Sequence, residues 1–249
     1  MQLTNPRIAS LTPTWASFRG FTLLFDNPGH GLGANAGDRV LTTDPETDFY
    51  KAVRTALAEI DSERQAAEFG LCWLPADTYH VTAWDGINDA NVADVTPQYS
   101  DQANEFLTGL PHSLREPAPF TLFAEEHLCD WQRPLTFRFE SLVNWRNHAL
   151  GAQLCPVTEG RANFAAFEAR RAMLNDGFHA EFGTKASSEY GPHSTLGYFA
   201  NEDDAERSHA QLAAWQSVFV HRLHGHVLRL QQISLYGFTN LTHFVKYAG

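Results

Sequence analysis

One short pattern occurs twice in this chain, 113 positions apart, and constrains the fold more than any other feature. The first copy is His80-Val81-Thr82 and the second is His193-Ser194-Thr195. Aromatic and β-branched residues surround both copies, which predicts one strand at 79–84 and another at 192–199. Successive side chains of a strand alternate between its faces, so each strand presents an imidazole and a hydroxyl on one face.

Two such strands placed side by side would surround a cleft with two imidazoles and two hydroxyls. Cleavage of a phosphodiester needs one group that accepts a proton from the nucleophile and another that donates a proton to the leaving oxygen. Histidine titrates near neutral pH and can fill either role, while threonine hydroxyls can donate hydrogen bonds to the phosphate oxygens. We therefore predict a catalytic set that needs no metal and no cofactor: His80, Thr82, His193 and Thr195.

The paired pattern resembles the signature of the two-histidine (2H) phosphoesterase superfamily, which includes LigT-like bacterial RNA 2′,3′-cyclic phosphodiesterases, plant cyclic phosphodiesterases and eukaryotic snRNA-trimming enzymes. The resemblance implies an α+β fold in which two pseudosymmetric lobes surround a central cleft, within a single bilobal domain that spans residues 1–249. Each lobe would contain an antiparallel sheet, outer helices and one motif strand. It also implies metal-independent cleavage of phosphodiesters, with the four predicted residues lining the cleft.

Strand alternation extends the prediction to neighbouring side chains. It places Trp84 on the face of the first histidine, and Gly197 and Phe199 on the face of the second. We predict that Trp84 and Phe199 bind the substrate, with Trp84 stacking on a nucleobase and Gly197 leaving room for a ligand. The alternative for Trp84 is a place in the core. The same alternation turns Tyr79 and Tyr198 to the opposite faces, where we expect structural roles.

The charge balance restricts the partners. The chain contains 18 Lys and Arg residues and 29 Asp and Glu residues, which gives a formal net charge of −11. This charge disfavours duplex nucleic acid, so we expect a small nucleotide or an RNA end as substrate. Three cysteines without a Cys-x-x-Cys pair, and a chain without an apolar run that could span a bilayer, favour a cytoplasmic protein that does not bind membranes.

The remaining pattern is a mixture of short strands and helices. We expect further strands at 18–25, 119–123, 135–139, 227–238 and 242–247, and helices from Asp44 to about 60, at 98–110, at 162–182 and after Asn201. We expect residues 85–119 and 144–161 to be the least regular. Arg171 lies on the apolar stripe of the helix at 162–182. We favour an extension of its side chain to the surface, and the alternative is that it reaches the phosphate.

Two other motifs suggest different chemistry. Gly31-x-Gly33-x-x-Ala36 has the spacing of a dinucleotide-binding loop, but no helix signal follows directly, so we expect a loop that could rim the cleft. His221, His224 and His226 could suggest a metal site, but no carboxylate or cysteine lies close in sequence, and surface histidines are the better interpretation.

The predicted function is therefore a metal-independent phosphodiesterase that acts on a 2′,3′-cyclic phosphate or a small 2′-5′-linked nucleotide or RNA end. The main alternative is a non-catalytic module of the same fold that binds a nucleotide or a phosphate. A weaker alternative is a metallohydrolase with histidine ligands. Turnover of a cyclic nucleotide distinguishes the first two, and activity in EDTA counts against the third.

Overall fold

The two motif strands lie in different sheets. The computed structural model describes residues 2–11, 14–26, 30–32, 38–41, 43–44 and 47–247. One sheet, here called the β7 sheet, contains β3 (Gly20–Phe25), β4 (His30–Leu32), β5 (Asp38–Leu41), β7 (Thr82–Asn88), β12 (Ile233–Asn240) and β13 (His243–Tyr247). The other, the β10 sheet, contains β6 (Leu71–Trp73), β8 (Leu135–Trp145), β9 (Ala149–Pro156), β10 (His193–Phe199) and β11 (Val227–Leu230).

Helices connect and flank these sheets. The α-helices are α1 (Asp48–Glu59), α2 (Ser62–Phe69), α3 (Pro97–Gly109), α4 (Pro119–Leu128), α5 (Arg161–Phe182) and α6 (Glu202–Leu223). Short 3₁₀ turns are η1 (Ala76–Thr78), η2 (Val92–Asp94), η3 (His112–Arg115) and η4 (Thr158–Gly160), and a small separate pair is formed by β1 (Ile8–Ser10) and β2 (Thr14–Trp15).

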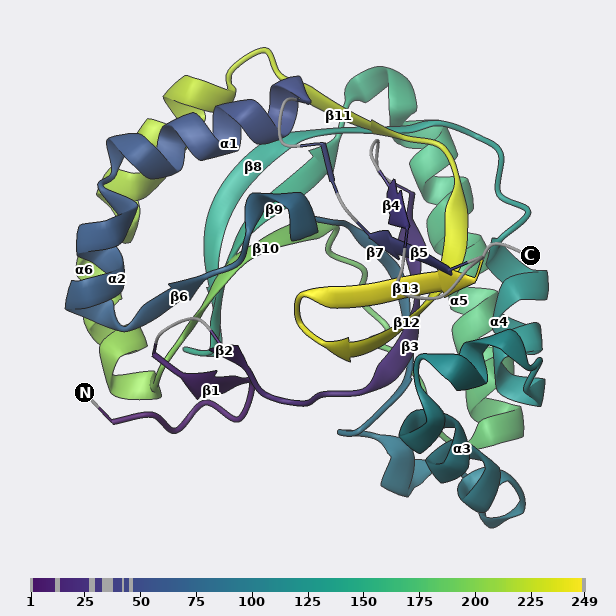
Figure 1. The fold of residues 1–249 in the computed structure, drawn as a ribbon. Helices are drawn as coiled ribbons and strands as arrows, with labels where there is room; N and C mark the ends of the chain where they lie inside the picture. Colours follow the sequence, from purple (N-terminus) through teal and green to yellow (C-terminus); the bar gives the residue numbers. More distant parts are fainter. Residues whose placement is uncertain are drawn as a thin grey trace.

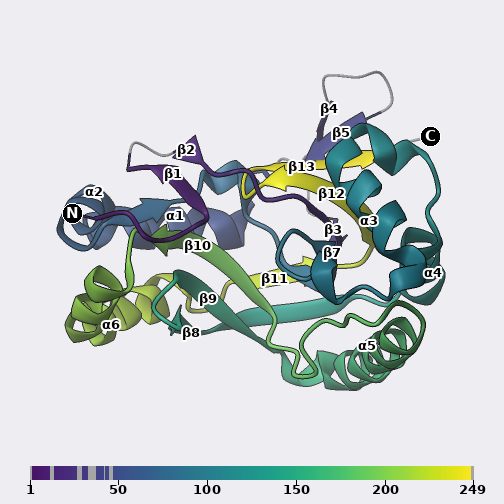
Figure 2. The same ribbon diagram turned by 90° about the horizontal axis from the view of Figure 1, so that it is seen from below.

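All pairings within the two sheets are antiparallel. The strand order is β4-β5-β13-β12-β3-β7 in the first and β11-β8-β9-β10-β6 in the second. The helices α1, α2 and α6 lie along the β10 sheet, and α3, α4 and α5 gather around the β7 sheet (Figures 1 and 2). The predicted α+β fold, with antiparallel sheets, outer helices and one motif strand in each sheet, is confirmed.

The outer face of the β7 sheet is packed with aromatic side chains. Phe21 of β3 stacks on Phe120 of α4 with ring centroids 5.7 Å apart and approaches Phe178 of α5 at 6.4 Å. Each of these rings is essentially buried. Burial of apolar surface on this scale is the main force that holds helices to a sheet. The opposite, inner face carries a second buried cluster, which consists of Leu24, Tyr236, Phe238 and Phe244.

The β10 sheet is attached to α6 in a similar way. Trp215 and Phe219 of α6 are buried in the core. Polar contacts set the position of the helix, because Gln216 accepts a hydrogen bond from the backbone of Leu142 and Asn144 donates one to the carbonyl of Ala205. The side of β8, β9 and β10 that carries Leu142 therefore faces α6, and the inner face of this sheet is the opposite one.

Several sequence predictions need correction. The segment 119–123 is not a strand but the start of α4, where Pro119 occupies the first turn and needs no hydrogen-bond donor. The Thr121 hydroxyl caps this turn, since it accepts from the backbone N–H of Ala118 at 3.1 Å. The first long helix has Thr47 rather than Asp44 at its N-cap position. Neither α2 nor β9 was expected.

Two other predictions concern the glycine-rich loop and the domain organisation. Most of the glycine-rich segment at 29–37 lies outside the described residues, and 30–32 forms β4. The proposal of one bilobal domain over residues 1–249 stays a prediction. Within the part of the chain that the structure describes, none of the helices has the length and apolar character needed to cross a bilayer.

Candidate active site

His80 lies at the end of the segment that leads from η1 into β7. Its ring Nδ1 is 2.8 Å from the carbonyl oxygen of Thr78, two residues earlier. A carbonyl oxygen only accepts hydrogen bonds, so Nδ1 must carry the hydrogen. The ring packs against Phe244 of β13, with centroids 4.7 Å apart, and is half-buried. In the neutral ring, Nε2 is therefore the atom with a lone pair.

His193 repeats this arrangement in the other sheet. It is the first residue of β10, and its Nδ1 is 2.7 Å from the carbonyl oxygen of Gly191, again two residues earlier. The ring lies beside Trp145 of β8, with centroids 4.1 Å apart. Both motif histidines thus have the same tautomer, fixed by the same local contact, and Nε2 is the basic atom of each.

The two motifs are close in space although they belong to different sheets. The Tyr190 hydroxyl, in the segment before β10, donates a hydrogen bond to the carbonyl of Thr82 at 2.9 Å. His193 is near enough to His80 for its charge to lower the pKa of His80. The structure therefore brings together the two histidines that the sequence pattern singles out.

Burial dominates the pKa of both histidines. It lowers the pKa of His80 from 6.5 to about 4, although the hydrogen bond to Thr78 opposes this change. Burial also lowers the pKa of His193, against the opposing effects of the Gly191 carbonyl and the Asp85 carboxylate. Loss of hydration disfavours the charged imidazolium, so burial favours the neutral form of both rings.

A β-bulge follows the threonine of the first motif. Thr82, Trp84 and Asp85 lie opposite Leu24, Leu23 and Thr22 of β3, respectively. Ala83 is therefore an extra residue without a counterpart, and the alternation of side chains shifts by one position after it. As a result Asp85, rather than Trp84, shares the inner face with Thr82.

The second motif contains a bulge at the same position. His193, Thr195 and Tyr198 lie opposite Gln153, Gly151 and Ala149 of β9, whereas Gly197 lies opposite Leu150. The extra residue is Leu196, directly after the threonine. Tyr198 therefore joins His193 and Thr195 on the inner face, which corrects the expectation that Tyr198 points the other way.

These bulges overturn the prediction that Trp84 and Phe199 line the site. Both side chains have no exposed surface. Trp84 packs edge-on against Phe178, and its indole N–H donates to Asn175 of α5 at 3.3 Å. For Trp84 the structure supports the alternative of a core residue. Gly197 serves close strand packing rather than ligand space, because a Cβ there would lie 2.7 Å from the carbonyl oxygen of Cys72.

Arg171 does not extend to the surface, as we had favoured, because the side chain is only 4% exposed. Its Nε donates a hydrogen bond to the carbonyl of Ala83 at 3.1 Å, at the bulge of the first motif. The guanidinium group also lies over the ring of Tyr190 at 4.9 Å. Arg171 thus holds the bulged backbone of β7 in place from α5.

Sequence alternation missed four residues near the motifs: Trp145, Asp85, Tyr190 and Tyr198. Trp145 lies beside His193, as Phe244 lies beside His80, whereas strand alternation predicts that Trp84 lies beside a motif histidine. Trp145 is partly exposed and lies over Gly151, where a Cβ would collide with the indole. The glycine opposite Thr195 was the only sequence signal that could have revealed this packing.

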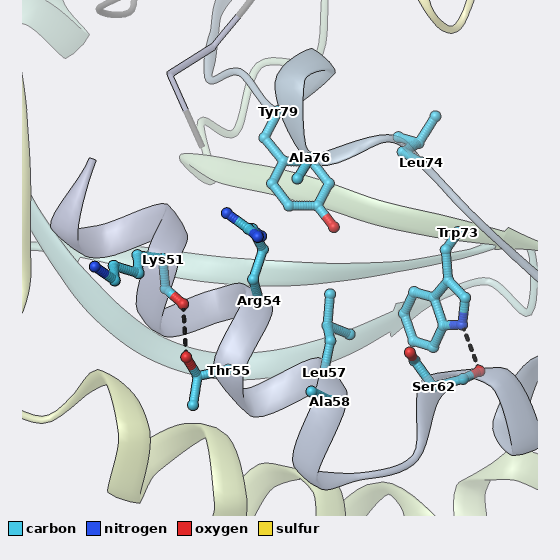
Figure 3. Close-up of a pocket in the computed structure, with 10 residues that line it drawn as sticks. All are labelled: Lys51, Arg54, Thr55, Leu57, Ala58, Ser62, Trp73, Leu74, Ala76 and Tyr79. Atoms are coloured by element: carbon cyan, nitrogen blue, oxygen red, sulfur yellow. Dashed lines mark hydrogen bonds between the residues drawn. The ribbon is translucent and has the colours of Figure 1, made fainter. Parts of the chain in front are cut away.

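A separate cavity of about 700 Å³ lies between α1 and the segment from β6 to Tyr79 (Figure 3). Lys51 and Arg54 approach it from α1, and Trp73 and Tyr79 line it from the other side. None of the predicted site residues is among its lining residues. Tyr79 is almost fully buried, in agreement with the structural role that we expected.

The histidines at 221, 224 and 226 lie at the end of α6 and in the turn that follows. Across the residues that the structure describes, no three or more His, Cys, Asp or Glu side chains gather as ligands of a metal would.

No family model matches the chain, and no curated protein sequence matches it. Among solved structures it is similar to ATU0111, a conserved protein of unknown function from Agrobacterium tumefaciens str. C58. That likeness has a TM-score of 0.52 and 15% sequence identity, and covers 97% of this chain and 89% of the other. At this identity, it shows a shared fold alone.

The chain is also similar to Usb1 from Kluyveromyces marxianus. The TM-score is 0.40 with 9% identity, over 91% of this chain and 97% of Usb1. A structure of the same protein with uridine monophosphate gives a TM-score of 0.38 with 10% identity, over 93% of this chain and 97% of Usb1.

Proposed function

We propose that this chain is a phosphodiesterase in which His80 and His193 carry out general acid–base catalysis. Its substrate is a 2′,3′-cyclic phosphate or a small 2′-5′-linked nucleotide or RNA end. The products of hydrolysis at such a phosphate are a phosphomonoester and a free hydroxyl group. This proposal agrees with the resemblance of the two His-x-Thr motifs to the 2H phosphoesterase signature.

The matched geometry of the two histidines is the observation that carries the proposal. Each ring donates its Nδ1–H to the carbonyl two residues earlier, so each Nε2 is the atom that exchanges a proton. Two proton-transfer groups from separate sheets are what attack on a phosphodiester and departure of the leaving oxygen require. A pair of structural histidines has no need for matched tautomers.

The surrounding groups fit a monoanionic phosphodiester. Thr82 and Thr195 are partly exposed on the inner faces, where their hydroxyls can donate hydrogen bonds to phosphate oxygens as charge accumulates. Trp145 provides a partly exposed aromatic ring next to His193, suited to stacking on a base. The net charge of −11 favours a small or terminal substrate over long RNA.

Metal independence is part of the proposal, because the two histidines supply both proton transfers. The test is turnover of 2′,3′-cyclic mononucleotides and a 2′-5′ dinucleotide by purified protein in EDTA. The double variant His80→Ala/His193→Ala serves as the blank. Turnover by the parent alone supports the proposal. Binding of a nucleotide without turnover by the parent would instead identify a non-catalytic module, and activity lost in EDTA would indicate a metallohydrolase.

A further inference from the structure

The bulges add a second pair of side chains, Asp85 and Tyr198, to the faces that carry the histidines. The backbone positions of this pair are equivalent, but their chemistry differs. Asp85 carries a carboxyl group, whereas Tyr198 carries a phenol that lies near Thr195. Two histidines with the same tautomer therefore have unequal electrostatic surroundings.

Hydrogen bonds connect the bulge of the first motif to the beginning of the second. Tyr190 lies three residues before His193 in the chain, and its hydroxyl donates a hydrogen bond to the carbonyl of Thr82. The Arg171 side chain binds the next carbonyl, that of Ala83. Asp85 lies two residues further along the same strand. Burial raises the pKa of its carboxyl group, and the nearby charges of His193 and Arg171 oppose this change.

Several groups surround His193 from different elements. Asp85 approaches from β7, His80 from the segment before β7, and uncharged Trp145 from β8. Arg171 and Glu168 of α5 lie further away. The charge of Arg171 lowers the pKa of the Tyr190 phenol, and the charge of Glu168 raises it. Arg7 acts on Tyr198 from the N-terminal segment. Asp85 is the charged group that favours a proton on His193.

His80 has a different environment. The influences on it are burial, the Thr78 carbonyl and His193, and a positive charge on His193 makes a second proton on His80 less favourable. Of the two rings, Asp85 favours a proton on His193 and is not among the groups that act on His80.

We propose that Asp85 is a positioning residue that makes His193 the general acid and leaves His80 as the general base. The inference rests on the proposed phosphodiesterase function and assigns the two roles within it. It also sets the orientation of the substrate, because the leaving oxygen must then lie on the side of His193.

The reaction balances with water as the nucleophile. His80 Nε2 accepts one proton of the water while the water oxygen forms a bond to phosphorus. The bond from phosphorus to the leaving oxygen breaks, that oxygen keeps the electron pair, and His193 Nε2 donates a proton to it. Exchange with solvent returns a proton to His193 and removes one from His80. The nucleoside that bears the leaving oxygen lies next to Trp145.

The first test measures the protonation of His193 without turnover. Histidine NMR titrations of the parent and of Asp85→Asn should show a lower pKa for His193 in the variant, while His80 changes less. Asp101→Asn is the matched control, since it removes the same charge from an exposed position on α3. The inference would be overturned if the pKa of His193 were unchanged in the folded variant, or if the pKa of His80 changed more than that of His193. If Asp85→Asn does not fold, Asp85→Ser replaces it.

The second test uses the pH dependence of kcat/KM on a 2′,3′-cyclic nucleotide. In Asp85→Asn the falling limb should move to lower pH, and the rate at pH 7 should decrease about tenfold for a displacement of one pH unit. The rising limb should stay in place. A uniform decrease at all pH values would indicate a structural role and contradict the inference.

The third test separates acid from base through the leaving group. A p-nitrophenyl phosphodiester releases p-nitrophenolate, which departs without a donated proton. His193→Ala should therefore retain most activity on this substrate, and His80→Ala should not. The reverse pattern would exchange the roles. If the parent hydrolyses no phosphodiester, the proposed function fails, and the NMR titration still decides whether Asp85 controls His193.

Discussion

The indole ring of Trp145 lies beside the imidazole of His193, with ring centroids 4.1 Å apart and planes inclined by 57°. The contact joins the end of β8 to the start of β10 across β9, and it is possible because position 151 of β9 is glycine. An aromatic side chain thus restrains a candidate catalytic ring and presents a surface to a ligand.

Replacement of Trp145 should weaken substrate binding. For Trp145→Ala we expect KM for a 2′,3′-cyclic nucleotide to rise about tenfold, since stacking on a base contributes about 1–3 kcal/mol. Steady-state kinetics on several nucleotides checks this. Gly151→Ala should have a similar effect, because a Cβ there displaces the indole. An unchanged KM in both variants would leave Trp145 with a packing role only.

Trp84 should behave in the opposite way. Trp84→Phe removes the hydrogen bond to the buried Asn175 and leaves a small void, so we expect a loss of about 1–3 kcal/mol in the free energy of unfolding. KM should stay within about twofold of the parent value, because the side chain is buried on the core face. Urea denaturation and kinetics on the same preparation measure the two effects. A large increase in KM with an unchanged free energy of unfolding would contradict the core role and indicate that Trp84 contacts the substrate.

Each motif histidine should be indispensable for cleavage of a 2′,3′-cyclic nucleotide. On this substrate, His80→Ala and His193→Ala should each lose about 10²-fold or more in kcat, the contribution expected of one proton transfer. Circular dichroism should show native secondary structure in both. His209→Ala removes an exposed histidine from α6 and should retain parent activity. Near-parent rates in both motif variants would refute the assignment.

Acid should destabilise the protein through His80. Its pKa is about 4 in the folded protein and about 6.5 when exposed, so between these values the unfolded chain binds a proton that the folded chain does not. Stability present above pH 6.5 is then lost as the pH falls toward 4. His80→Asn, whose amide can still donate to Thr78, should show a shallower decrease in melting temperature over this range. If melting temperature falls with pH equally in parent and variant, the lowered pKa of His80 is contradicted.

The pairing of a histidine with a threonine in each motif could be predicted from the sequence, because the two residues of each pair are only two positions apart. A histidine and a threonine two positions apart share a face of any regular strand, so His80 and Thr82 could be paired without knowledge of the sheet. The positions beyond the threonine could not be predicted in this way. Alternation holds only until the first bulge, and Ala83 and Leu196 carry no residue signature of one.

Other discrepancies have similar physical origins. The run from Pro119 to Phe123 is short and apolar, and such runs fit a strand or a helix equally until the capping by Thr121 is known. β9 contains few β-branched residues, so its composition is poor in strand signals. Tertiary pairing with β8 and β10 determines its conformation instead.

The order in which the strands enter the two sheets has a consequence for biosynthesis. β3 lies between β7 and β12, so the sheet that positions His80 lacks an inner strand until residues 233–240 have been made. Pairing over more than 200 positions forms late and slowly, compared with local contacts. A nascent chain can therefore contain both histidines and still lack the framework that aligns them.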